Sequence, residues 1–105
     1  MSRKEYLIKT KELLIEKGWT QSTRTNHEGK ICITQALTEA YGLDYFVSPY
    51  SISTLTNIEN YCSYIETFIY LTRKLNKILY VWNDEKERTK EGVLEFLQKA
   101  IDSCE

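Results

Sequence analysis

The residue types most suggestive of chemistry stand together in the stretch VWNDEKERTKEGVL, residues 81–94. It places Trp82, an Asn-Asp pair and an Arg-Thr pair between two apolar helical patterns. Asp84 has the chemistry of a general base, and Arg88 has the chemistry of an anion clamp. Such a site also needs a cleft and a second titratable group near by. Because no His or Cys neighbours these two residues in sequence, the catalytic interpretation lacks a partner group.

A structural and a recognition role compete with catalysis for the same residues. In the structural role, Asn83 and Asp84 hydrogen-bond their own backbone in a turn, Thr89 caps the last helix and Trp82 is buried beneath. Arg88 then pairs with Asp84 or with the free carbonyls at the end of the preceding helix. In the recognition role, Trp82, Asp84 and Arg88 form a patch that faces a partner, since Trp and Arg dominate interface energies. Turns between helices need these residue types more often than catalysis does, so we favour the structural role and rank recognition second.

His27 and Cys32 are the other candidates for chemistry. His27 stands beside Glu28 in a polar turn, where a lone histidine is usually solvated. Cys32 opens a predicted helix, whose dipole lowers a thiol's pKa, but it lies between two isoleucines, which is typical of a buried cysteine. Structural zinc needs four ligands, and a Cys-His pair supplies two. We therefore expect no metal site and no cofactor.

Length, charge and cysteine usage limit the number of domains, the types of partner and the cellular location that we expect. The chain of 105 residues has a formal net charge of −1, which suits a single domain over residues 1–105 with its basic and acidic residues interleaved. We expect neither a nucleic acid nor a membrane as partner, because no basic surface and no long apolar span is evident. Three cysteines in no CxxC pair favour reduced thiols and a cytoplasmic location.

The first two helical patterns flank a polar loop. Residues 2–17 form an amphipathic helix with Ser2 and Glu5 at its start, Gly18 as its left-handed stop and Trp19 packing behind it. Residues 20–30 are predicted to be a loop that includes a short irregular hairpin as one option. The second helix presents one apolar face, formed by Ile33, Ala36, Leu37, Ala40 and Tyr41. The alternation in KICIT leaves a short extended segment before this helix open.

The second half of the chain predicts two more helices. Residues 58–79 carry one narrow polar stripe on an otherwise apolar helix, which is typical of a central helix. Residues 90–103 form the last helix. The loop between the second and third helices brings four aromatic residues together: Tyr41, Tyr45, Phe46 and Tyr50. They are predicted to close the open end of the bundle, with an exposed platform for a partner as the alternative. The fold class is all-α, a small four-helix domain with a long central apolar helix and two longer loops.

Three segments carry a resemblance to a known family. The succession GWTQ, then GKICITQAL, then VWNDEKERTKEGVLEFLQKAI resembles a family of small bacterial and phage proteins classed as a domain of unknown function. Residues 43–77 match it only loosely. Gln35 replaces the family's usual Gly, and Gly92 replaces the Glu that would complete a capping box with Thr89. The resemblance implies this fold and no reaction, and its matching positions are Gly18, Trp19, Gly29, Cys32, Ala36, Leu37, Trp82, Asn83, Asp84, Arg88, Thr89, Val93 and Leu94.

Three functional hypotheses follow. We expect a non-enzymatic interaction or regulatory protein whose partner is another protein, with a phage-borne inhibitor of a host system as one form of it. The alternative is a small-molecule or nucleotide-binding domain that holds an anion with Arg88 and the start of the last helix. The third is an enzyme that uses Asp84, His27 or Cys32. Both a monomer and a homodimer are compatible with the sequence.

Overall fold

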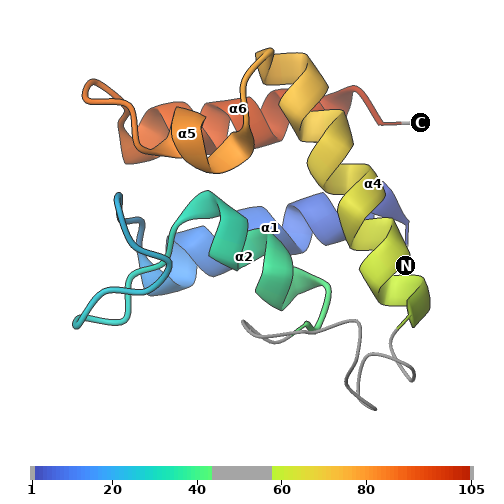
Figure 1. Ribbon diagram of the computed structural model, residues 1–105, viewed down its shortest axis with the longest axis horizontal. Coiled ribbons are helices and arrows are strands. Elements are labelled where there is room, and N and C mark those ends of the chain that lie inside the picture. Colours follow the sequence, from blue (N-terminus) through green and yellow to red (C-terminus); the bar gives the residue numbers. More distant parts are fainter. Residues whose placement is uncertain (1, 44–57, 105) are drawn as a thin grey trace.

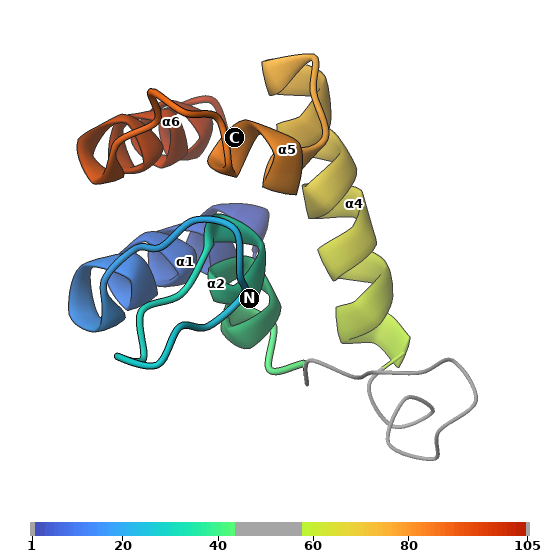
Figure 2. The same ribbon diagram turned by 60° about the vertical axis from the view of Figure 1, so that its left-hand side comes forward.

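The computed structural model describes residues 2–43 and 58–104, and within these ranges the chain is mostly helical. Its helices are α1 (Arg3–Lys17), α2 (Ile33–Ala40), α4 (Ile58–Leu75), α5 (Leu79–Asn83) and α6 (Lys90–Asp102). The first and last helices, α1 and α6, lie side by side with opposite directions (Figure 1). The long helix α4 crosses this pair at one end, as Figure 2 shows from a second side. The all-α class predicted from the sequence is confirmed. The β-structure of the described ranges is limited to isolated β-bridges.

Helix α1 begins and ends on local signals. The Ser2 hydroxyl accepts a hydrogen bond from the Glu5 amide at 3.2 Å, and the Glu5 carboxylate accepts one from the Ser2 amide. This reciprocal capping box satisfies two amides that lack a partner within the helix. At the other end Gly18 has a φ of 90°, and its amide donates to the Leu14 carbonyl at 2.9 Å. A Cβ on Gly18 would lie 2.9 Å from Lys30 Cγ, so both the backbone angle and the close approach favour glycine.

Helix α2 is the enclosed helix of the fold. Its predicted face of Ile33, Ala36, Leu37, Ala40 and Tyr41 is buried. The polar side chains on its other sides are buried as well: Thr34, Gln35 and Thr38. The prediction that residues 58–79 form the central helix is therefore wrong. The physical reason is that α4 meets the rest of the molecule along one side, so that Leu71 and Thr67 are buried while Ile65 and Ile69 on the outer side stay exposed.

The segment predicted as one helix over 58–79 is divided by Asn76. Asn76 has a φ of 55°, and α4 ends at Leu75 directly before it. Asparagine is one of the few non-glycine residues that adopt this left-handed conformation readily. A separate short helix, α5, starts at Leu79. The described ranges therefore hold five helices where four were predicted.

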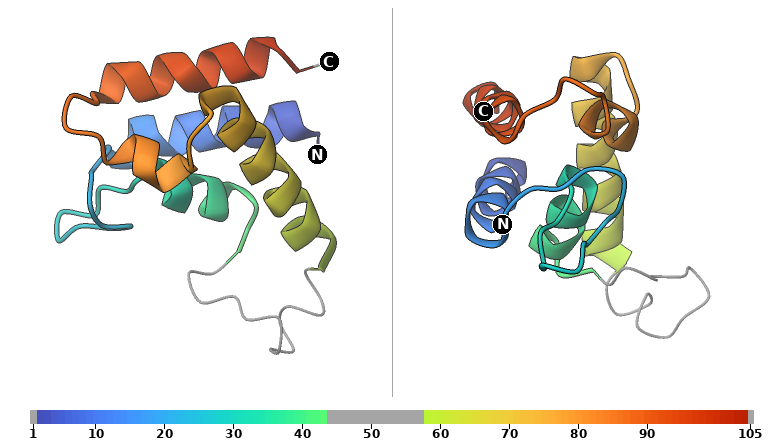
Figure 3. Two further views of the ribbon diagram at one scale, coloured as in Figure 1. Left: turned by 45° about the horizontal axis from the view of Figure 1, so that its top comes forward. Right: turned by 90° about the vertical axis from the view of Figure 1, so that its left-hand side faces the viewer.

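The core is formed by one connected cluster of apolar side chains. Helix α1 contributes Leu7 and Leu14, while α4 and α5 contribute Leu71, Leu79 and Trp82. Helix α6 contributes the face that its sequence pattern predicts: Val93, Leu97, Ala100 and Ile101. Seen along the axes of α1 and α6, the two helices pack next to each other with α2 beside them (Figure 3). Each apolar stripe thus faces the common core, as amphipathic helices require.

The loop after α1 is fixed by single-residue pairings around Ile31. Ile31 forms isolated β-bridges with Trp19 and Thr25. Its amide donates to the Gly18 carbonyl and its carbonyl accepts from the Thr20 amide, both at 3.0 Å. The short extended segment that the sequence left open before the second helix is thus limited to the single-residue bridges of Ile31. It holds Trp19 and Thr20 beside the start of α2.

Candidate functional site

The Asn83 side chain joins three distant parts of the chain at the end of α5. Its Oδ1 accepts from Trp19 Nε1 at 2.7 Å and from the Ile33 amide at 3.1 Å. Its Nδ2 donates to the Thr20 carbonyl at 3.2 Å. Asn83 is fully buried, and an amide side chain that meets three such partners is well satisfied for a buried polar group. We call Trp19, Thr20, Ile33 and Asn83 the joint.

Neighbouring side chains extend the joint. The Gln21 side chain donates to the carbonyls of Asn83 and Glu85, at 3.0 and 2.7 Å. Asp84 Oδ1 accepts from the Ser22 amide at 2.8 Å and from Asn83 Nδ2 at 2.9 Å. The sequence placed Asn83 and Asp84 in a turn that bonds its own backbone. The structure instead places Asn83 in the last position of α5, with its side chain bonded to segments that lie fifty or more residues away.

Arg88 holds the loop between α5 and α6. Its Nε donates to the Trp82 carbonyl at 3.1 Å, its guanidinium lies 4.0 Å from the centre of the Trp82 ring, and its Nη2 is 3.2 Å from a Glu85 carboxylate oxygen. The sequence analysis gave two structural partners for Arg88, Asp84 or a carbonyl at the end of the preceding helix. The structure shows the carbonyl, that of Trp82. Thr89 accepts a hydrogen bond from the Gly92 amide at the start of α6. Arg88 and the Gly92 amide, which the anion-binding hypothesis would use, are thus engaged within the chain.

Trp82 lies in the core rather than on the surface. It is buried and contacts Phe96, with ring centres 5.0 Å apart. The recognition hypothesis required Trp82, Asp84 and Arg88 to face a partner together. Because Trp82 is buried, its ring is not available for such a contact. Asp84 is exposed and is the most exposed of the three, since the Arg88 side chain is 24% exposed.

The aromatic cluster of the second loop falls mostly outside the described residues, since Tyr45, Phe46 and Tyr50 belong to residues 44–57. Tyr41 is described and is buried. It stacks on Tyr6 at 3.8 Å between ring centres, and its hydroxyl is 2.5 Å from Thr67 Oγ1. Burial raises the pKa of Tyr41 above its usual value. Its part in the molecule is to tie α2 to α1 and α4.

Cys32 and His27 lie in different surroundings. Cys32 is the N-cap of α2, and its sulfur accepts from the Gln35 amide at 3.3 Å. Burial raises the pKa of its thiol, against the opposing effect of that hydrogen bond. The His27 side chain is 90% exposed. Cys32 and Asp84 line one cavity, and His27 is not part of its wall; within residues 2–43 and 58–104 no three His, Cys, Asp or Glu side chains group as metal ligands.

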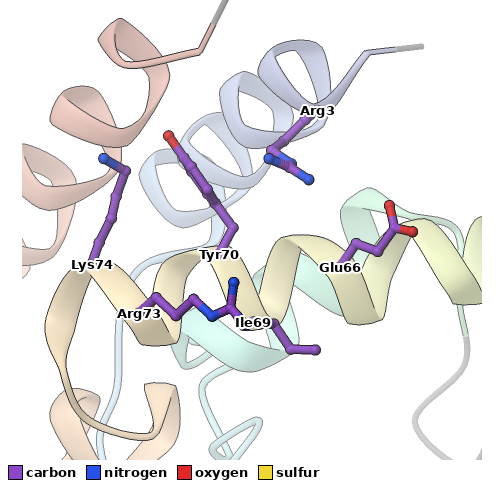
Figure 4. A pocket seen from close by; sticks show the side chains of 6 residues that line it. All are labelled: Arg3, Glu66, Ile69, Tyr70, Arg73 and Lys74. Atoms are coloured by element: carbon purple, nitrogen blue, oxygen red, sulfur yellow. The ribbon is translucent and has the colours of Figure 1, made fainter.

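A second surface feature lies at the opposite end of α1, between α1 and α4. It is an open groove of about 520 Å³, and Figure 4 shows its six lining side chains: Arg3, Glu66, Ile69, Tyr70, Arg73 and Lys74. The Arg3 guanidinium is 4.6 Å and Lys74 Nζ is 5.0 Å from the centre of the Tyr70 ring. We call it the cationic groove. The sequence placed Tyr70 and Arg73 on a polar stripe, but Arg3 is too distant in sequence to have been grouped with them.

A comparison with known families matches residues 1–103 to a family of unknown function (DUF6197). The chain belongs to this family. The resemblance seen in the sequence is thereby confirmed over nearly the whole chain. No curated protein and no solved structure matches the chain. None of the described helices combines the length and the apolar character needed to cross a bilayer.

Proposed function

We propose that the protein is a non-enzymatic interaction protein, and that its cationic groove binds an acidic segment of another protein. The observation that carries this proposal is a groove lined by three cations, two of which lie against one aromatic ring. Arg3, Arg73 and Lys74 line the groove with a single carboxylate, Glu66. Among residues 2–43 and 58–104 none of these three cations forms an ion pair. Cations that are left without carboxylates attract and orient an acidic partner.

Apolar contact beside the cations supports a protein partner. Ile69 lines the groove and is 43% exposed, and Ile65 one turn earlier on α4 is 36% exposed. Exposed isoleucines in a row on one helix supply the apolar contact that protein interfaces use at their centre. A phosphate backbone would gain little from contact with Ile69. An acidic segment with apolar anchors fits the groove better than a nucleic acid.

A regulatory role is compatible with such a surface. A protein that acts by occupying its partner needs a complementary surface and no reaction. The phage-borne inhibitor of a host system considered from the sequence is one protein of this kind. The proposal holds for a monomer and for a homodimer, because all the residues that line the groove belong to one chain.

Charge reversal tests the proposal. Fluorescence anisotropy would follow labelled acidic peptides with leucine or phenylalanine anchors, at several salt concentrations. The double variant Arg73→Glu, Lys74→Glu is expected to weaken binding by about tenfold or more, because two attractive contacts become repulsive. Both side chains are exposed, so folding should be retained. The matched control, Lys9→Glu with Lys86→Glu, makes the same change in net charge at exposed lysines outside the groove.

Three results would reject the proposal. The first is the absence of binding to any acidic peptide at low salt. The second is an equal loss in the groove variant and in the control variant, which would indicate a general effect of net charge. The third is tighter binding of single-stranded oligonucleotides than of acidic peptides.

A further inference from the structure

A second cavity lies beside the joint, at the other end of α1 from the cationic groove. It has a volume of about 250 Å³, and its wall includes Arg24, Cys32, Thr34, Tyr80 and Asp84. Cys32 and Thr34 are its buried members, while Tyr80 and Asp84 are exposed. The cavity therefore runs from solvent to the first turn of α2. The interaction function proposed above makes no use of it.

The Thr34 hydroxyl points to a ligand in this cavity. Thr34 is 6% exposed, and its Oγ1 is buried without a hydrogen-bond partner in the described part of the chain. Its backbone carbonyl, by contrast, accepts from Thr38 Oγ1 at 2.8 Å. A buried hydroxyl without a partner is destabilising. On the wall of a cavity, it is a group to which a ligand can supply the missing hydrogen bond.

The wall of the cavity carries charges of both signs. Arg24 is held against α2 by hydrogen bonds from Nε to Gln35 and from Nη2 to Thr38, at 3.0 and 3.1 Å. The first turn of α2 adds partial positive charge on the same side of the fold. Asp84 is held through Oδ1, which accepts from the Ser22 amide and from Asn83. Both charged groups are thus fixed before any ligand arrives, which lowers the entropic cost of binding.

We propose that this cavity binds a small zwitterion of the free α-amino acid class, with its carboxylate toward Arg24 and Thr34 and its ammonium toward Asp84. A purely anionic ligand would be repelled by Asp84, and a purely cationic ligand would be repelled by Arg24. The volume lies below the roughly 300–1,000 Å³ typical of sites for drug-sized ligands, so a nucleotide is too large. The exposed ring of Tyr80 at the rim offers apolar contact to the ligand's side chain. Cys32 adds no charge, since burial raises the pKa of its thiol.

The first test is an NMR titration of the intact chain with free L-amino acids at millimolar concentration. Saturable shifts are expected at the backbone amides of Arg24, Thr34 and Asp84. The N-acetyl derivative and the carboxamide of the best amino acid each lack one of its charges. Each is expected to bind about tenfold more weakly or worse, because one charge-assisted hydrogen bond is lost.

Three variants make the test specific to the cavity. Thr34→Val keeps the shape and removes the hydroxyl, so affinity should fall about fivefold while stability is retained. Asp84→Asn keeps the Oδ1 acceptor and removes the charge, so the amino acid should lose its advantage over its N-acetyl derivative. Thr72→Val is the matched control, because Thr72 also has a buried hydroxyl without a described partner and does not line the cavity. Its affinity should equal that of the unaltered chain.

Three outcomes would overturn the proposal. Unchanged amide signals with every amino acid would show that the cavity holds solvent only. Equal affinities for the amino acid, its amide and its N-acetyl derivative would show that the cavity does not recognise the two charges of a zwitterion. An equal loss of affinity in Thr34→Val and Thr72→Val would show that the hydroxyl of the cavity has no specific part.

Discussion

Replacing Asn83 by alanine tests whether the joint stabilises the fold. The substitution removes three hydrogen bonds to other segments, which involve Trp19 Nε1, the Ile33 amide and the Thr20 carbonyl. Each bond contributes about 1 kcal/mol, and a partner left buried and unsatisfied costs about 1–3 kcal/mol. We therefore expect the free energy of unfolding to fall by about 3–5 kcal/mol, from a total of about 5–15 kcal/mol. At about 4–8 °C per kcal/mol for a domain of this size, Tm should fall by roughly 12 °C or more.

Urea unfolding followed by circular dichroism measures this loss, and Asn60→Ala provides the matched control. Asn60 donates a single hydrogen bond, from Nδ2 to the Tyr41 carbonyl at 3.3 Å. Its replacement should cost about 0.5–1.5 kcal/mol. A double-mutant cycle of Asn83→Ala with Trp19→Phe should give a coupling energy of at least about 0.5 kcal/mol. If Asn83→Ala costs no more than Asn60→Ala, or if the cycle shows no coupling, the joint does not stabilise the fold as argued.

Three further substitutions probe the first turns of α2 and α6 and the loop between α5 and α6. Burial raises the pKa of the Cys32 thiol in the folded chain. As pH rises, this thiol therefore loses its proton in the unfolded chain before it does so in the folded chain. The free energy of unfolding should fall as pH rises above about 8.5, the pKa of an unperturbed cysteine. Cys32→Ser keeps the cap and should lessen this alkaline loss in urea titrations at increasing pH; an unchanged slope would contradict it. Gly92→Glu should raise stability by about 1 kcal/mol in thermal unfolding, because it adds helix propensity and a capping box. The Thr89 hydroxyl lies 3.3 Å from the position of a new Cβ and must move slightly to admit it; a lower Tm would show that this crowding outweighs the gain. Arg88→Ala removes the hydrogen bond to the Trp82 carbonyl and the contact with its ring, so stability should fall by about 1–2 kcal/mol, while a loss of acidic-peptide binding would argue that Arg88 takes part in recognition.

Local signals were sufficient to predict where α1 and α6 begin. Ser2 and Glu5 have the spacing of a capping box, and that box is present because its hydrogen bonds lie within one turn. The apolar face of α2 was likewise predicted from spacing alone, since a helix repeats every 3.6 residues whatever it packs against. What the pattern did not indicate is that the polar side of α2 is buried too. Arg24 covers part of that side through hydrogen bonds to Gln35 and Thr38.

Long-range contacts account for most of what the sequence analysis missed. The apolar residues of α4 predicted a central helix, but the number of apolar residues on a helix does not determine how many neighbours it receives. Asn76 lacks the strong helix-ending signal of Gly or Pro, so the division between α4 and α5 was not expected. The cationic groove depends on Arg3 and Lys74 meeting at one ring. No local pattern brings together two residues that are 71 positions apart in the sequence.

The pairing of α1 with α6 also constrains when the protein can fold during its synthesis. Leu7 and Leu14 of α1 share one core with Leu97 and Ile101 of α6, and the ribosome adds the residues of α6 after those of α1, α2, α4 and α5. Until they leave the exit tunnel, the apolar faces of α1 and α2 lack a large part of their cover. Contacts between residues this far apart in sequence also form slowly, because a long loop must close first. A nascent chain halted before α6 should therefore remain sensitive to protease.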